Sequence, residues 1–239
     1  MGRLILVRHA QASFLAPDYD RLSSVGEVQA RRLGEYWTRR NLAFDSVYAG
    51  PRARQFGTAR IVAETYQSAQ LRFPPPVRME EFDEFEAEEV LKQGLAQLLN
   101  QDTHVRELHE AYRASKGDGD ERTSFQKLFE VVIGKWVDGA LVVPGVESWS
   151  EFSTRVNRGL SEVMSSADSS AQVAIFSSGG PIAVAMQRAL HLSPQDTLRT
   201  AWMSRNCSYS EFLFSADRFG LSSFNVFPHL EDADLLTYR

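Results

Sequence analysis

The chain has 239 residues, of which 43% are hydrophobic and 24% charged, proportions that are ordinary for a globular protein with a core of its own. Its formal net charge of −5 argues against a nucleic acid or an anionic membrane as a partner. The single cysteine, Cys207, cannot form a disulfide bond within the chain, and no apolar run approaches the roughly 20 residues of a membrane span. These features predict a cytoplasmic protein.

The first predicted element is a strand over Leu4–Val7, a continuous apolar run that is typical of a strand buried on both faces of a parallel sheet. A loop that contains Pro17 and Asp18 follows. A helix is then predicted to begin at Ser23 or Ser24, either of which can cap it. Its packed side is expected to hold the apolar residues Val28, Leu33, Tyr36 and Trp37.

Strand and helix continue to alternate beyond this helix. A short strand is predicted over 45–49, a helix over about 52–68, and another short strand over 77–79, after a run of three prolines. From about 82 to 142 the sequence is polar with helical spacing, and a glycine-containing loop at 116–120 interrupts it. This middle part therefore reads as a set of helices joined by a loop.

The rest of the chain returns to the alternating pattern. Helical spacing over 147–164 is followed by a buried strand over 173–176 and by a helix that ends near Leu190. Two late segments, 209–214 and 220–226, alternate as antiparallel strands do. Together the elements predict an α/β fold: one domain over 1–239, a three-layer α/β/α sandwich with a mostly parallel central sheet, and a helical cap inserted at about 82–144.

Polar or positive groups follow three of the predicted strands. Arg8-His9 follows the first, Arg52 and Arg54 follow the second, and Ser177-Ser178-Gly179-Gly180 follows the late strand and opens a helix. Open α/β sheets bind ligands at the carboxyl ends of their strands, and the N–H groups at a helix start suit a phosphate. The pattern therefore predicts a phosphate pocket around one imidazole.

The residue types in this pocket favour phosphoryl transfer. A neutral histidine is a good phosphoryl acceptor, and a neighbouring arginine opposes its protonation by like-charge repulsion. Arginine forks also hold the charge that spreads over the three oxygens of the transferring group. The leaving alkoxide needs a proton, for which the Glu80-Glu81 pair after the third strand is the predicted source.

The motifs resemble those of the histidine phosphatase (phosphoglycerate-mutase-like) superfamily. Leu6–Ala10 resembles its L-x-R-H-G signature, with Ala10 in place of the glycine. Residues 19–23 and 26–30 resemble its helix opening L-[ST]-x-x-G-x-x-Q-A, and 54–59 resemble R-A-x-x-T-A. Further similarity lies in Met79–Phe82 (L-x-E), 145–148 (G-E-S) and 225–230 (N-x-x-x-H-L). The resemblance covers nearly the whole chain outside the cap.

The resemblance implies a set of roles. His9 would receive a phosphoryl group from a small phosphorylated ester and pass it to water or to a second hydroxyl, without a metal or another cofactor. Arg8 and Arg54, rather than Arg52, would hold the phosphate, and Glu81 would be the proton donor. Ser178 and Gly179 would complete the phosphate site.

One departure concerns position 178. The superfamily places a second pocket histidine in an S-H-G-G element, where this chain has Ser177-Ser178-Gly179-Gly180. A serine hydroxyl donates one neutral hydrogen bond and carries no charge, so roughly 10-fold or more in rate is at stake. His229 either compensates for this loss or has a structural role near the C-terminus, of which the structural role is favoured.

Three functions remain open on the sequence. The leading one is a phosphomonoester phosphatase. The second is a phosphate-binding module that is weakly active or inactive, which Ser178 favours and the intact set of His9, Arg8, Arg54 and Glu81 opposes. The third is a phosphosugar mutase, in which the phosphoenzyme must be shielded from water.

Overall fold

The computed structural model describes residues 1–13 and 20–238. The predicted loop at Pro17 and Asp18 and the first residue of the 19–23 motif lie outside the described residues. The chain divides into two compact units, one formed by Met1–Glu84 with Arg155–Arg239 and the other by Phe85–Thr154. None of the helices described here has the length and apolar character that crossing a bilayer requires.

The described part of the first unit holds one sheet of six strands, in the order β3-β2-β4-β1-β5-β6. Four strands run parallel: β1 (Gly2–Arg8), β2 (Ser46–Ala49), β3 (Val77–Arg78) and β4 (Gln172–Ser177). The last two, β5 (Tyr209–Phe214) and β6 (Phe219–Val226), are antiparallel. The predicted mostly parallel sheet is confirmed. Because β1 and β4 are buried on both faces, both read as apolar runs.

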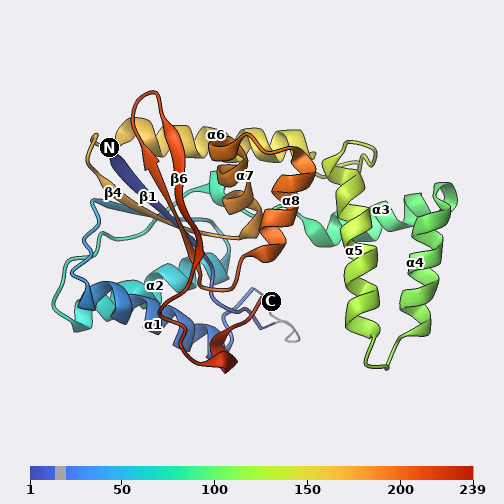
Figure 1. The fold of residues 1–239 in the computed structure, drawn as a ribbon, viewed down its shortest axis with the longest axis horizontal. Helices are drawn as coiled ribbons and strands as arrows, with labels where there is room; N and C mark the ends of the chain where they lie inside the picture. Colours follow the sequence, from blue (N-terminus) through green and yellow to red (C-terminus); the bar gives the residue numbers. More distant parts are fainter. Residues whose placement is uncertain (14–19, 239) are drawn as a thin grey trace. The chain divides into compact units, whose positions relative to one another are not determined.

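Helices cover both faces of this sheet, which confirms the three-layer α/β/α sandwich. Figure 1 shows α1 (Ser24–Arg39) and α2 (Ala53–Ser68) on one face, with α6 (Trp149–Ser166) and α7 (Gly179–Leu190) on the other. A further helix, α8 (Pro194–Met203), packs against α7; the sequence analysis did not predict it. The described residues of this unit also form two single-turn 3₁₀ helices, η1 (Glu80–Phe82) and η2 (Ala233–Leu235).

At the start of α1 the predicted cap is confirmed, but one residue predicted to face inward is exposed. Ser23 is its N-cap, and the Ser23 Oγ accepts a hydrogen bond from the Gly26 N–H at 3.0 Å. The expected inward position of Val28 is wrong, because Val28 is 43% exposed while its polar neighbour Gln29 is fully buried. The Gln29 amide offsets the cost of burial through bonds to the Gln11 N–H and the Leu235 carbonyl.

The second unit consists largely of helices, as the sequence predicts. They are α3 (Ala87–Gln101), α4 (Thr103–Ala114) and α5 (Glu121–Val137), and the predicted loop at 116–120 joins the last two. Trp136 lies in this unit between the rings of Phe85 and Trp149, with centroid distances of 5.0 and 5.8 Å. An ion pair between Lys135 and Asp102 at 2.7 Å links α5 to the start of α4.

Candidate active site

The polar segments that follow β1, β2 and β4 meet at one edge of the sheet. Arg8, the last residue of β1, pairs with Ser177, the last residue of β4. The His9 N–H donates to the Ser177 carbonyl at 2.7 Å, and the Gly50 N–H donates to the Phe176 carbonyl at 2.9 Å. The parallel strands therefore bring the three predicted segments together at their carboxyl ends.

His9 is held in one tautomer. Its Nε2 lies 3.2 Å from the Arg54 Nε, and its Nδ1 lies 2.8 Å from the Ala10 carbonyl oxygen. An arginine N–H only donates and a carbonyl only accepts, so the proton belongs on Nδ1 and the lone pair on Nε2. The lone pair needed for attack on phosphorus is therefore on Nε2.

His9 is also kept neutral. The side chain is buried, and burial, followed by the positive charges of Arg54 and Arg8, holds the pKa of His9 well below its usual range. An imidazole in this environment keeps its lone pair at neutral pH. The site thus holds a neutral, oriented imidazole beside cations, which is the state that nucleophilic attack requires.

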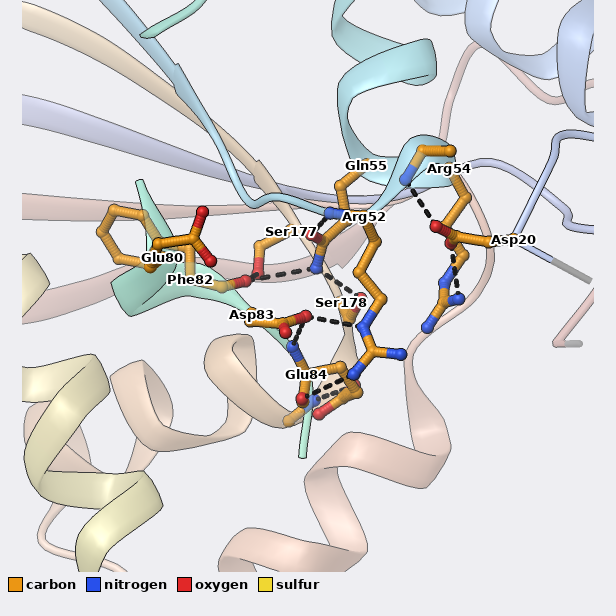
Figure 2. A network of polar contacts seen from close by, with 12 residues as sticks. Asp20, Arg52, Arg54, Gln55, Glu80, Phe82, Asp83, Glu84, Ser177 and Ser178 are labelled. Atoms are coloured by element: carbon orange, nitrogen blue, oxygen red, sulfur yellow. Dashed lines mark hydrogen bonds and ion pairs between the residues drawn. The ribbon is translucent and has the colours of Figure 1, made fainter. Parts of the chain in front are cut away.

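The guanidinium of Arg54 is held between His9 and Asp20. It is 6% exposed, and besides its contact with His9 its Nη1 donates to the Asp20 Oδ1 at 2.8 Å. The second Asp20 oxygen accepts from the Ala53 N–H at 2.7 Å, so Asp20 also caps the start of α2 (Figure 2).

Thr58, one turn later, accepts from the Ala10 N–H at 3.0 Å and donates to the Arg54 carbonyl at 2.7 Å. This bond ties the residue after His9 to α2.

Arg52 has different partners, although it is only two residues away. Its Nε donates to the Asp83 carboxylate at 2.6 Å and its Nη2 to the Glu84 carbonyl at 3.1 Å. Figure 2 shows its side chain extending toward these two residues, while Arg54 points to Asp20. The Glu84 carboxylate in turn accepts from the Gly180 N–H at 3.0 Å, in the first turn of α7. An acidic segment after η1 therefore lies against the helix start.

Arg8 donates to two carbonyls of the C-terminal part of the chain. Its Nη1 bonds the Ser204 carbonyl, and its Nη2 bonds the Tyr238 carbonyl at 2.7 Å. Asn225 fixes the same loop, since it accepts from the Arg205 N–H at 2.9 Å and donates to the Met203 carbonyl at 3.0 Å. The role of Arg8 as a phosphate ligand stays a prediction, and the positive charge of Arg8 contributes to the lowered pKa of His9.

Ser178 and Gly179 lie where β4 turns into α7. Ser178 is 1% exposed and occupies the N-cap position of α7, but its side chain makes no capping bond. Its Oγ accepts instead from the Gln55 Nε2 at 2.8 Å (Figure 2). Gly179 is buried, and a Cβ there would lie 3.2 Å from the Ala201 carbonyl oxygen. The turn is thus closely packed against both α2 and α8.

Glu81 has no described contact with His9. Its carboxylate pairs with Arg158 of α6 at 3.1 Å, and its carbonyl accepts from Arg155 at 3.0 Å. Gly159 leaves the space for this packing, because a Cβ there would collide with the Glu81 side chain. The proton-donor role of Glu81 remains a prediction, and it requires the carboxyl group to leave Arg158.

His229 holds the backbone behind the nucleophile. Its Nε2 lies 2.9 Å from the Cys207 carbonyl oxygen, and the Cys207 N–H donates to the His9 carbonyl at 3.1 Å. Its ring stacks on Tyr209 at a centroid distance of 6.2 Å. Burial lowers the pKa of His229 to about 4, so the ring is neutral near pH 7. These contacts agree with the structural role favoured by the sequence.

Sequence reasoning missed three residues of this site. Asp20 and Glu84 gave no signal of their own, because an acidic residue near a loop is ordinary. Gln55 gave one, since it follows Arg54 where the R-A-x-x-T-A pattern has alanine. Within residues 1–13 and 20–238, no group of three His, Cys, Asp or Glu side chains is arranged to hold a metal ion.

A protein family model matches most of the chain. Residues 4–130 and 118–226 match the family model described as "Histidine phosphatase superfamily (branch 1)". Among curated proteins, none matches the sequence significantly.

Solved structures give matches over nearly the full length. The Bacillus stearothermophilus protein YhfR aligns with a TM-score of 0.67 at 13% identity, over 97% of this chain and 100% of that chain. A phosphoserine phosphatase mutant from Entamoeba histolytica, in complex with phosphoserine, has a TM-score of 0.60 at 18% identity, over 96% and 100%. A phosphoglycerate mutase from Bacillus anthracis has a TM-score of 0.61 at 16% identity, over 96% and 95%. At these identities the likeness establishes a shared fold.

Proposed function

The chain belongs to the histidine phosphatase superfamily, and we propose that it hydrolyses small phosphomonoesters through a phosphoryl group carried on Nε2 of His9, without a metal or other cofactor. The observation that carries the proposal is the state of His9: a neutral imidazole with its proton on Nδ1 and its Nε2 lone pair against Arg54. The Nε2 lone pair is the group that attacks phosphorus in this proposal, and the arginine beside it can hold the charge of the phosphoryl group.

The reaction divides into two displacements. The His9 Nε2 attacks phosphorus, the ester P–O bond breaks, and the leaving oxygen takes a proton from a carboxyl group. Water then attacks the phosphorus, the same carboxylate accepts its proton, and the N–P bond breaks to release phosphate and neutral His9. The Ala10 carbonyl accepts from Nδ1–H throughout, so it stabilises the ring as it gains positive charge on phosphorylation.

Arg54 changes partner during this sequence. At rest its Nε–H is bonded to the lone pair that must reach phosphorus. An incoming phosphoryl group therefore draws the guanidinium off Nε2 and onto its own oxygens, which both uncovers the nucleophile and holds the charge. Arg8 adds a second cation next to the nucleophile, and Ser178 and Gly179 contribute donors from the turn into α7.

We predict that the leaving-group proton comes from Glu81. Glu81→Gln should lower kcat/KM for an alkyl phosphate by about 10²-fold and leave kcat/KM for an aryl phosphate little changed, because kcat/KM reports the first displacement and a phenolate leaves without a proton. Steady-state rates on the two substrates measure this difference.

Glu84→Gln is the matched control, since Glu84 is another glutamate near the pocket and its carboxylate contacts the Gly180 N–H. It should affect both substrates alike. A loss on the alkyl phosphate that appears only in Glu84→Gln would move the role of proton donor to Glu84.

A phosphate-binding module without turnover is the second candidate, and one observation favours it. Arg54 and Arg52 already have carboxylate partners in Asp20 and Asp83, so a phosphate must displace Asp20 from Arg54 to bind it fully. Together with the uncharged Ser178, this predicts weaker transition-state binding than a fully cationic pocket gives. A phosphosugar mutase differs only in that a second hydroxyl, rather than water, accepts the phosphoryl group.

An assay on a panel of aryl and alkyl phosphates with EDTA present separates these functions. The phosphatase predicts release of inorganic phosphate that EDTA does not change. The binding module predicts no turnover but measurable binding of inorganic phosphate by calorimetry. The mutase predicts phosphorylated isomers in place of inorganic phosphate. Loss of activity in EDTA that added divalent metal restores would contradict the metal-independent mechanism.

A further inference from the structure

Gln55 is a fully buried glutamine that joins three segments around the pocket. Its Oε1 accepts from the Arg52 N–H at 3.1 Å, at the start of α2. Its Nε2 donates to the Phe82 carbonyl at 3.1 Å and to the Ser178 Oγ at 2.8 Å. Figure 2 shows the amide between the end of η1 and the turn into α7.

The partners of this amide fix its orientation. The Arg52 N–H can only donate and the Phe82 carbonyl can only accept, so Oε1 must face the first and Nε2 the second. A flipped amide would oppose two oxygens at Phe82 and two N–H groups at Arg52. The Ser178 hydroxyl must therefore accept from Gln55, and its own hydrogen must be donated elsewhere.

Ser177 and Ser178 differ in the acceptor of their hydroxyl hydrogen. The Ser177 Oγ donates to the Phe82 carbonyl at 2.8 Å, so its hydrogen is used within the protein. Ser178 makes no capping bond, and its described side-chain contact is the one with Gln55. Ser178 is also close to the nucleophile along the backbone. The His9 N–H bonds the Ser177 carbonyl, and Ser178 is the next residue.

We infer that Gln55 is a positioning residue that orients the Ser178 hydroxyl as a hydrogen-bond donor to the phosphoryl group. The inference rests on the proposed function and deepens it. Gln55 lies directly beside position 178, because its Nε2 is 2.8 Å from the Ser178 Oγ, and it is packed so closely on its other side that a Cβ at Gly50 would collide with its Oε1. Compared with the superfamily motifs, a glutamine replaces the smaller alanine at position 55, and a serine replaces the larger histidine at position 178.

A double-mutant cycle tests the pair. Ser178→Ala removes the donor, and Gln55→Leu keeps the shape of the side chain but leaves the hydroxyl without its fixed orientation. Each single change should lower kcat by about 10-fold, the value of one neutral hydrogen bond, with little change in KM. If Gln55 acts through Ser178, the double variant should lose no more than either single variant.

Ser177→Ala provides the matched background, because it removes the neighbouring hydroxyl whose hydrogen already goes to Phe82. Gln55→Leu should still lower kcat there and should have no further effect in Ser178→Ala. Thermal melts establish that each variant folds, and Gln55→Met replaces Gln55→Leu if the latter does not.

A cycle of dissociation constants for inorganic phosphate, measured by calorimetry, separates the failure of this inference from the failure of the proposed function. If the wild type has no turnover, the proposed function fails, and the phosphate affinities alone report whether Gln55 and Ser178 are coupled. The expected result is coupling in kcat, or coupling in phosphate affinity where the wild type has no turnover. Losses from the two changes that simply multiply, or a Gln55→Leu variant with wild-type values, would overturn the inference.

Discussion

Replacing His9 with alanine is expected to reduce kcat/KM for phosphomonoesters by about 10⁴-fold or more, because the variant has no nucleophile to carry the phosphoryl group. The binding groups around it remain, so phosphate affinity should change much less than turnover. The measurement is a steady-state assay on an aryl phosphate, combined with calorimetric titration of inorganic phosphate. A large loss of turnover with retained binding separates a catalytic role from a structural one.

His104→Ala is the matched control for this experiment. His104 is an exposed histidine of α4, far from His9 in sequence and in the other compact unit, and its replacement should leave kcat/KM unchanged. A His9→Ala variant that keeps its fold and most of its activity would contradict the proposed intermediate.

The second large effect is expected at Arg54. Arg54→Ala should lower kcat/KM by about 10²-fold or more, the size of the loss when a charged transition-state donor is removed. Arg52→Ala should have a much smaller effect, because the Arg52 fork lies against Asp83 and Glu84 rather than against His9. The two variants are matched in residue type, and their positions lie two residues apart at the start of α2. Equal losses from both would mean that Arg54 has no special part in the reaction.

Arg54→Ala should also change the pH dependence. In the wild type, burial and the charges of Arg54 and Arg8 hold the pKa of His9 below its ordinary value of 6.5, so the nucleophile stays neutral as the pH falls through 6.5. Without Arg54 that pKa rises, and protonation removes the lone pair at a higher pH. The acid limb of a kcat/KM profile between about pH 5 and pH 8 should therefore shift upward. An unchanged limb would show that Arg54 does not act on His9 electrostatically.

The elements of the fold were predictable where local pattern and tertiary environment agree. Strands β1 and β4 are buried on both faces, and their sequences are apolar throughout. Prediction failed where a polar side chain is buried with its partners, since burial of Gln29 depends on bonds to Leu235 and Gln11 that are remote in sequence. Helix α8 was missed because only Thr197 and Leu198 of its ten residues are buried, which leaves a weak periodic signal.

The candidate site was predictable as a set of positions but not as a network. The carboxyl ends of parallel strands place Arg8-His9 beside Ser177-Ser178, and that follows from topology alone. The partner of each arginine does not follow, because Asp20 and Asp83 meet them only after the chain has folded. The sequence also does not indicate whether a larger side chain would fit at position 178. In the structure the amide of Gln55 contacts the Ser178 hydroxyl.

Chemical trapping of the intermediate tests the central claim most directly. The protein is mixed with an aryl phosphate labelled at phosphorus, and the reaction is quenched rapidly into alkali, in which an N-linked phosphate is stable. The account predicts one acid-labile phosphate per chain, located on His9 by peptide mapping and absent from His9→Ala. Label on Ser177 or Ser178, stable in acid, would contradict it.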